Sequence, residues 1–308
     1  HTLDIKAQIG SGEAYQGMSE NDLFSMEYRG LQHAKLQQDE PPLRRPVAIV
    51  TGAAGAIGAG ICPGLLEQGC HGAVTDLPGD RLDSLVGQLG DQYGPRVIGV
   101  AIDVTDRDSV SRGFNSVISE WGGVDLVIVN AGVALVSSLE EMELEVFRRL
   151  ERVNVEGTLL MHAEAGRLFR RQGIGGDIVL ISTKNVFAPG ARFGAYSATK
   201  AGSHQLARIA SLELAEIGVR VNMVSPDAVF GEDDRKSGLW AEVGPDRMKA
   251  RGLDEKSMQE YYQTRNLLKS KVTAEHVSNA VLFFVTRQTP TSGATIPVDG
   301  GLPDATPR

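Results

Sequence analysis

The chain has 308 residues, a formal net charge of −8 and 42 % hydrophobic residues, so it is long enough to bury a large core without disulfide cross-links. Acidic residues outnumber basic ones by 39 to 31, which leaves no basic field for nucleic acid, and the two cysteines, Cys62 and Cys70, make no disulfide framework. No apolar run reaches the roughly 18 residues that span a bilayer, and the first residues carry no signal pattern, so we expect a cytoplasmic protein without a membrane partner.

Residues 1–45 differ from the rest of the chain. They carry weak helical patterning around residues 21–38 and lead into an acidic, proline-rich stretch, DEPPLRRP, which is typical of a linker. Two interpretations remain open: an N-terminal extension docked on the surface, or a linker remnant of an upstream domain. We expect the folded domain to occupy residues 46–308.

After Pro46, short apolar segments alternate with amphipathic segments. Strands are predicted at residues 47–50, 73–76, 97–102, 126–130, 177–182, 220–224 and 295–298. Helices are predicted from the end of a Gly-rich turn to about residue 68 and at residues 81–93, 107–121, 144–172, 196–217 and 277–285. This alternation predicts βαβ units and a parallel sheet with helices on both faces.

The segment 227–271 interrupts this alternation. It is long, polar and partly helical, and it follows the predicted strand at 220–224. Because α/β sheets bind ligands at the carboxyl ends of their strands, we expect this segment to form a helical substrate cover. A surface embellishment without a role in the site is the alternative.

A strand, a Gly-rich turn and a helix start follow one another directly in PVAIVTGAAGAIGAGI, residues 46–61. Gly52 permits a sharp turn, and Gly58 permits close packing of the helix on the strand. The amino terminus of the helix would offer free N–H groups and a positive dipole end to a phosphate. The segment therefore predicts a dinucleotide-binding turn.

Asp76 ends the second predicted strand, 24 residues after Gly52. A carboxylate at this place accepts hydrogen bonds from the adenosine ribose hydroxyls and repels a 2′-phosphate. Ala53 and Ala54 offer no cation to such a phosphate. The sequence therefore favours NAD over NADP as the cofactor, with an ordinary strand-end carboxylate as the alternative interpretation of Asp76.

Tyr196 and Lys200 lie in the segment AYSATK at the i, i+4 spacing of a helix face. A free phenol has a pKa of about 10, too high for a base at neutral pH. A nearby ammonium favours the phenolate by its charge, and an oxidised nicotinamide adds positive potential. Alone, such a pair is typical of a solvated helix face. Combined with the Gly-rich turn, it predicts a tyrosine general base.

Together these features resemble the short-chain dehydrogenase/reductase family over residues 46–301. The motifs that carry the resemblance, in chain order, are TGAAGAIG from Thr51, DV from Asp103, NAG from Asn130, YSATK from Tyr196 and VDGG from Val298. The resemblance implies an α/β fold of the Rossmann type: a doubly wound, parallel, seven-stranded sheet with helices on both faces and a helical substrate cover.

The resemblance also implies which residues would do the chemistry. Tyr196 would act as the base, Lys200 would lower its pKa and bind the nicotinamide ribose, and Asn154 would anchor a proton-relay water. The family places a hydroxyl thirteen residues before the tyrosine; Thr183 holds this place, with Ser182 as the alternative. The implied cofactor contacts are Gly52, Ala54, Gly55, Ala56, Ile57, Gly58, Asp76, Leu77, Asp103, Val104, Asn130, Ala131, Gly132, Tyr196, Lys200, Pro226, Asp227 and Val229.

The sequence departs from the family at two places. Ala56 stands where Gly is more usual, and Asp227 replaces the Gly that follows Pro226 in the family's PG turn. Within the family, the segments STKNVFAPG, FGAYSATKAG and EYYQTRNLLK resemble the dehydrogenase half of bifunctional rhamnulose-1-phosphate aldolase/lactaldehyde dehydrogenases. This implies NAD-dependent oxidation of a lactaldehyde-like hydroxyaldehyde, sugar or polyol. A sugar or sugar-acid dehydrogenase of another pathway is the alternative.

Polar and aromatic residues near the predicted site are candidates for substrate contact. They are Lys184, Asn185, Arg192 and Trp240, with Arg235 and Lys236 in the predicted cover. Cations among them would suit a carboxylate or phosphate on a small-molecule substrate, and a solvated surface charge is the alternative for each.

Other functional classes fit the sequence less well. A non-catalytic NAD-binding sensor or scaffold would tolerate loss of Tyr196, Lys200 or the hydroxyl, and all three are present. The six histidines form no ligand-spaced group with the cysteines, so no metal is expected. The family resemblance implies a homotetramer or homodimer in which the helices at 144–172 and 196–217 form an interface.

Overall fold

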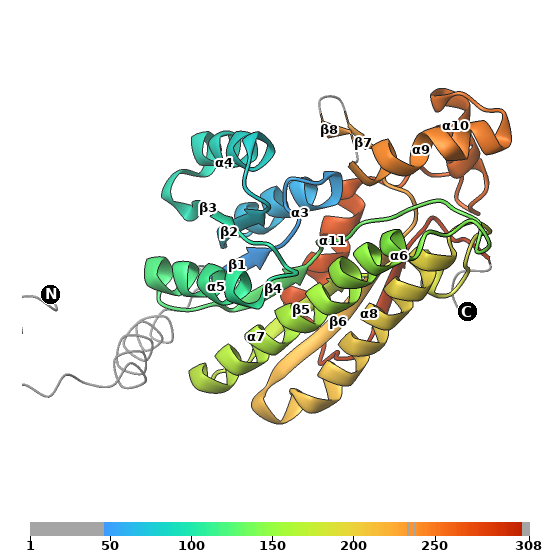
Figure 1. Cartoon of the computed structure of the whole chain (residues 1–308). Helices are drawn as coiled ribbons and strands as arrows, with labels where there is room; N and C mark the ends of the chain where they lie inside the picture. The colour runs from blue at the N-terminus through green and yellow to red at the C-terminus, as the bar shows by residue number, and fades with distance from the viewer. Residues whose placement is uncertain (1–45, 233–234, 237, 304–308) are drawn as a thin grey trace, which may run out of the picture. The chain divides into compact units, whose positions relative to one another are not determined.

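A seven-stranded parallel sheet forms the centre of the fold (Figure 1). The computed structural model describes residues 46–303 except 233, 234 and 237, so both interpretations of residues 1–45 lie outside the described residues. The strand order is β3-β2-β1-β4-β5-β6-β9, and all neighbours are parallel. The strands are β1 Val47–Val50, β2 His71–Asp76, β3 Val97–Ala101, β4 Leu126–Val129, β5 Gly176–Ile181, β6 Val219–Pro226 and β9 Thr295–Val298.

The strand order reverses between β1 and β4, which confirms the predicted doubly wound sheet. Every residue of β1, β4 and β5 is buried, as expected for parallel strands that are covered on both faces. The carboxyl ends of strands at such a reversal are where open α/β sheets bind their ligands. A ligand is therefore expected to bind at the segments that follow β1 and β4.

Helices cover both faces of the sheet (Figure 1). One face is covered by α3, α4 and α11, which share an apolar core with the strands, and the other by α5, α6, α7 and α8. Within the described residues, no helix combines the length and the hydropathy needed to cross a membrane. The helices are α3 Ala56–Glu67, α4 Asp80–Tyr93, α5 Arg107–Trp121, α6 Leu144–Glu151, α7 Gly157–Gln172, α8 Gly194–Glu213, α9 Gly238–Arg251, α10 Glu255–Thr264 and α11 Ala274–Val285.

The long helix predicted over residues 144–172 is confirmed, with a π-helical turn, Arg152–Glu156, between its two α-helical parts, α6 and α7. At this turn the backbone carbonyl of Asn154 accepts hydrogen bonds from the hydroxyls of Thr158 and Ser203, each at 2.7 Å. Single π-turns inside α-helices are frequent at functional sites. Apolar periodicity runs on through such a turn, so the sequence pattern did not reveal it.

The segment 227–271 contains a short ribbon and two helices. The ribbon pairs β7 Gly231–Glu232 with β8 Arg235–Lys236, and α9 and α10 follow. The rings of Phe230, Trp240 and Tyr262 pack edge to face, 4.6–5.9 Å apart, in an apolar cluster that includes Phe193 and Tyr196 of the α8 region. The helical character of the segment is confirmed; its function as a substrate cover stays a prediction.

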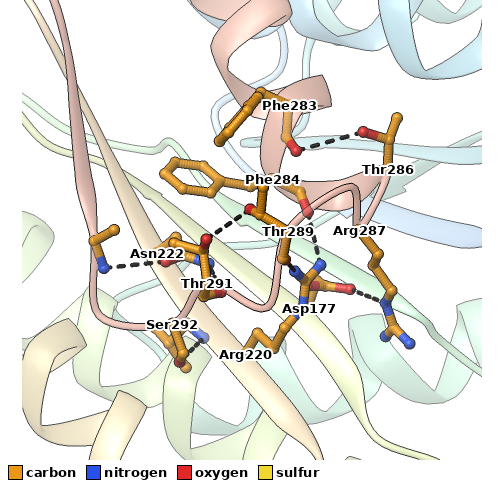
Figure 2. Close-up of polar contacts among 12 residues, drawn as sticks. Asp177, Arg220, Asn222, Phe283, Phe284, Thr286, Arg287, Thr289, Thr291 and Ser292 are labelled. Carbon is orange, nitrogen blue, oxygen red and sulfur yellow. Dashed lines mark hydrogen bonds and ion pairs between the residues drawn. The ribbon is translucent and has the colours of Figure 1, made fainter.

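A buried ion-pair network lies at the amino end of β5 (Figure 2). Asp177, which is 1 % exposed, pairs with Arg220 of β6 at 2.6 Å and with Arg287, just after α11, at 2.8 Å. Arg220 also donates to the carbonyl oxygens of Phe284, at 2.6 Å, and Thr289, at 3.1 Å. The network fastens the connection between α11 and β9 to the sheet, at the opposite end of the strands from Tyr196.

Candidate active site

The Gly-rich turn joins β1 to α3 at the carboxyl edge of the sheet. Gly52 has a φ of +61°, and a Cβ there would lie 2.7 Å from the Cα of Ala131, so a larger residue would be strained and would clash. A Cβ at Gly58 would lie 2.5 Å from the carbonyl oxygen of Gly52. No side chain in the described part of the chain caps the amino terminus of α3. Its first N–H groups can therefore bind an anion.

Asn130, at the end of β4, holds this turn in shape. Its Nδ2 donates to the carbonyl oxygens of Thr51 and Gly52, both at 2.9 Å, and its backbone N–H donates to the Thr51 hydroxyl at 3.0 Å. The side-chain amide of Asn130, predicted as a cofactor contact, thus donates its hydrogen bonds to the turn itself. Its role in the structure is to position the backbone that would meet the cofactor.

Asp76, at the end of β2, lies beside the same turn. Its carboxylate accepts hydrogen bonds from the backbone N–H groups of Ala54, at 2.9 Å, and Leu77, at 2.8 Å. Arg81 of α4 donates to the carbonyl oxygen of Ala54 at 3.2 Å. Sequence reasoning missed this arginine, although its position five residues after Asp76 was a usable signal. The turn therefore has both an anion and a cation beside it.

The remaining predicted cofactor contacts follow β3 and β6 at the same edge. Asp103 accepts hydrogen bonds from the backbone N–H of Thr105, at 2.9 Å, and from its hydroxyl, at 2.8 Å, which shapes the loop after β3. Val104 and Val229 are buried. The structure therefore brings the predicted segments together at one end of the sheet.

Asp227, which replaces the Gly of the family's PG turn, forms an ion pair with Arg265 just after α10. The guanidinium donates from Nε to the carboxylate at 3.2 Å and contacts both carboxylate oxygens with its terminal nitrogen. It also lies 4.0 Å from the ring centroid of Tyr262. The pair fastens α10 to the end of β6. Sequence reasoning missed Arg265, because 38 residues separate it from Asp227.

Tyr196 and Lys200 lie on the first two turns of α8, and both are buried. Burial raises the pKa of the Tyr196 phenol to about 12, and the hydroxyl of Thr183, placed to hydrogen-bond the phenol, lowers it by less. Ser182 instead bonds Nδ1 of His204 at 3.0 Å. The structure therefore brings Thr183, and not Ser182, to the tyrosine.

Asn154 and Lys200 face each other across Gly132. The ammonium of Lys200 donates to the carbonyl oxygen of Ile181 at 2.9 Å. Asn154 bonds the backbone of Val133 through both its Oδ1 and its Nδ2, each at 2.9 Å. A Cβ at Gly132 would lie 3.2 Å from Oδ1 of Asn154 and 3.3 Å from Nζ of Lys200. Glycine thus avoids crowding these two groups.

The predicted substrate residues occupy different environments. Asn185 is buried beside Thr183, Lys184 is half-buried, and Arg192 is exposed with a φ of +68°. Trp240 is buried in the aromatic cluster with Phe230, at a ring-centroid distance of 4.6 Å. The side chains of residues 235 and 236 lie outside the described residues.

Burial lowers the pKa of Lys200 to about 8. This shift makes the free energy of unfolding depend on pH. An unfolded lysine has a pKa of about 10.4, so between about pH 8 and pH 10 the unfolded chain binds more protons than the folded one. The free energy of unfolding must therefore rise with pH over this window, by up to about 3 kcal/mol. We expect Lys200→Met to abolish this rise.

Urea unfolding of the parent and of Lys200→Met across this pH window measures the effect. Lys249→Met, which alters an exposed lysine of α9, is the control and should keep the slope of the parent. Equal slopes for the parent and Lys200→Met would contradict the assignment.

The two cysteines and His162 are buried in the packed structure. Among the described residues, no cluster of three or more His, Cys, Asp or Glu side chains is placed to hold a metal ion. Cys62 and Cys70 are buried and free of disulfides. The ring of His162 bonds the carbonyl oxygen of Thr158 at 2.8 Å inside α7, as a packed histidine would.

Comparisons with known proteins agree with this geometry. The model of the "short chain dehydrogenase" family matches residues 46–238. The "Uncharacterized oxidoreductase YuxG" of Bacillus subtilis (strain 168) is 33 % identical over 298 residues, which cover 96 % of this chain and 43 % of that protein. The chain therefore spans less than half of the length of this relative.

One further relative and one solved structure that resemble this chain are both sorbitol-6-phosphate 2-dehydrogenases. Sorbitol-6-phosphate 2-dehydrogenase of Escherichia coli (strain K12) is 30 % identical over 260 residues, covering 83 % of this chain and 97 % of that protein. The crystal structure of sorbitol-6-phosphate 2-dehydrogenase SrlD from Erwinia amylovora matches with a TM-score of 0.76 and 30 % identity, over 83 % of this chain and 98 % of that one.

Proposed function

Because the chain belongs to the short-chain dehydrogenase family, whose members are oxidoreductases acting on CH–OH groups, we propose that it transfers a hydride between NAD and a small hydroxyaldehyde, sugar or polyol. One observation carries the proposal: Tyr196 and Lys200 lie buried one helical turn apart on α8, with the hydroxyl of Thr183 placed to hydrogen-bond the phenol. Lactaldehyde is our first candidate substrate, on the resemblance of the segments around these residues.

The residues at the carboxyl edge of the sheet fit a nicotinamide cofactor. The tight turn that Gly52 and Gly58 permit, and the uncapped start of α3, suit a pyrophosphate. Asp76 suits the adenosine ribose. When bound there, the cofactor would supply the hydride-transfer chemistry. The segments after β3, β4 and β6 would complete its site.

We assign the proton transfer to Tyr196, which would take the proton of the substrate hydroxyl during oxidation and return it during reduction. Since burial raises the pKa of its phenol to about 12, the phenolate needs nearby positive charge. Protonated Lys200 would supply this charge, and Thr183 would orient the substrate oxygen. Asn154, held rigidly by the backbone of Val133, would anchor the proton relay.

Asp76 and Arg81 allow a test of the preference for NAD. We expect Asp76→Ala to raise the ratio of kcat/KM with NADP to kcat/KM with NAD by about ten- to a hundredfold, because it removes a carboxylate that would repel the 2′-phosphate. Adding Arg81→Met should cancel most of this gain, since Arg81, a cation beside the same turn, would bind the 2′-phosphate of NADP. An unchanged ratio in Asp76→Ala would contradict the assignment.

The substrate class is tested by initial rates of NADH formation with L-lactaldehyde, L-rhamnose, L-fucose, D-sorbitol and D-sorbitol 6-phosphate. The names of two relatives support a polyol or its phosphate, and the segment resemblance supports lactaldehyde. Among the unphosphorylated compounds, a clear preference for lactaldehyde is the expected result. Preference for a sugar or polyol would favour a dehydrogenase of another pathway. NAD binding without turnover of any of them would favour a sensor or scaffold.

We also propose that the chain assembles as a homotetramer or homodimer through α7 and α8. These helices pack side by side and expose large apolar side chains. Leu159 of α7 is 50 % exposed and Leu212 of α8 is 78 % exposed. Apolar side chains on adjacent exposed helices support burial against a second copy.

A further inference from the structure

Two cations lie near the reactive tyrosine without a carboxylate partner among the described residues. Lys184 directly follows Thr183, is half-buried, and donates to one backbone carbonyl oxygen at 3.1 Å. Arg247 lies on α9, and its guanidinium is 4.9 Å from the ring centroid of Phe193. That ring in turn lies 6.1 Å from the ring of Tyr196. Arg247 of α9 therefore approaches the aromatic rings beside Tyr196, and Lys184 lies one residue after Thr183.

Positive charge is in excess around these two residues. Burial, Arg265 and Arg247 lower the pKa of Lys184, while Asp227 and Asp299 raise it. Arg265 and Asp227 neutralise each other in their ion pair. Asp299 is the remaining anion, and one of its oxygens accepts a backbone N–H at 2.8 Å. Its other oxygen is buried and has no hydrogen-bond partner among the described residues, so two cations and one carboxylate leave a net positive charge here.

Buried polar atoms adjoin the same cations. Nε of Arg247 is buried and has no partner in the described part of the chain, while its terminal nitrogen donates to the Tyr262 hydroxyl at 3.2 Å. Asn185, next to Lys184, is 6 % exposed, and its Oδ1 is likewise unpaired within the described residues. Buried polar atoms in proteins are nearly always paired, so Nε of Arg247, a donor, suits an anion, whereas Oδ1 of Asn185, an acceptor, suits a hydroxyl or N–H donor.

We propose that Lys184 and Arg247 bind a phosphate monoester on the substrate, an inference that rests on the proposed dehydrogenase function of this site. A guanidinium offers paired N–H donors that match phosphate oxygens, and an ammonium adds a point charge. A phosphate monoester carries nearly two negative charges at neutral pH and several acceptor oxygens, so it can contact both cations at once. The substrate class is therefore a short phosphorylated polyol or hydroxyaldehyde, with its reacting hydroxyl at Tyr196.

The first test measures the binding of inorganic phosphate by isothermal titration at constant ionic strength. Saturating NAD is present, so that the Gly-rich turn is filled. We expect Arg247→Met and Lys184→Met, which keep the apolar stems, each to weaken phosphate binding at least tenfold. The matched control is Arg251→Met, one turn further along α9, where the guanidinium lies 4.3 Å from the ring of Tyr261. It should bind phosphate as the parent does.

The second test compares kcat/KM for D-sorbitol 6-phosphate with that for D-sorbitol. The ratio should fall at least tenfold in Arg247→Met, recover in part in Arg247→Lys, and stay unchanged in Arg251→Met. Circular dichroism verifies that each variant is folded.

Equal phosphate binding by the parent and both methionine variants would overturn the inference, whatever the chain oxidises. Phosphate binding that is lost in these variants, together with no turnover of any substrate, would support the anion site and count against the proposed function. The two failures are therefore distinguishable.

Discussion

Tyr196→Phe is expected to lower kcat for alcohol oxidation by about 10²- to 10⁴-fold, the usual contribution of a positioned general base. The ring of Tyr196 packs in the apolar cluster with Phe193 and Trp240, and phenylalanine keeps this packing. Only the hydroxyl that bonds Thr183 is removed. The loss should therefore fall on the chemical step, with little change in stability or in NAD binding.

Single-turnover NADH formation, measured beside NAD affinity and the unfolding midpoint, separates these effects. Tyr261→Phe is the matched control, because Tyr261 lies on α10 with its ring against Arg251 and Arg265 and has no proposed part in proton transfer. It should keep the activity of the parent. Full activity in Tyr196→Phe would remove the proposed base.

Asp177→Ala is expected to lower the free energy of unfolding by about 3–5 kcal/mol, the usual effect of removing one partner of a buried ion pair. Its carboxylate is 1 % exposed and pairs with both Arg220 and Arg287 (Figure 2). The side chain of Arg220 is only 17 % exposed and cannot regain full hydration without Asp177. That of Arg287 is 50 % exposed and can turn to water.

Arg287→Met is therefore the control, and it should cost no more than about 1 kcal/mol, as for an exposed pair. Urea unfolding followed by circular dichroism measures both values. Because the network lies at the opposite end of the strands from Tyr196, Asp177→Ala should keep kcat at temperatures where it stays folded. Equal losses of unfolding free energy in the two variants would contradict the expectation that the buried pair of Asp177 with Arg220 contributes more than the pair with Arg287.

Local sequence was sufficient to predict the strands, the Gly-rich turn and the placement of Tyr196 and Lys200 on one helix. Strands β1 and β4 appear as short apolar runs because a parallel sheet is covered on both faces. The four-residue spacing of Tyr196 and Lys200 places both on one face of any helix that contains them. These features depend on neighbours in the chain, so periodicity and spacing predict them.

The choice between Ser182 and Thr183 needed the tertiary structure. Adjacent residues of an extended segment point in opposite directions, so a shift of one residue exchanges their environments. The pattern alone does not reveal which hydroxyl faces α8 at Tyr196 and which meets His204. The packed structure directs Thr183 to the tyrosine and Ser182 to the histidine.

By itself, the sequence determined the fold class, the Gly-rich turn after β1 and the spacing of Tyr196 and Lys200 on one helix, because each of these arises from residues close together in the chain. Tertiary structure alone decided that Asp227 pairs with Arg265, that Asp177 joins β5 to Arg287, and that Arg247 approaches Phe193. These contacts join residues 38, 110 and 54 positions apart. Charge complementarity and burial select such partners only after the sheet and its helices have brought them within reach.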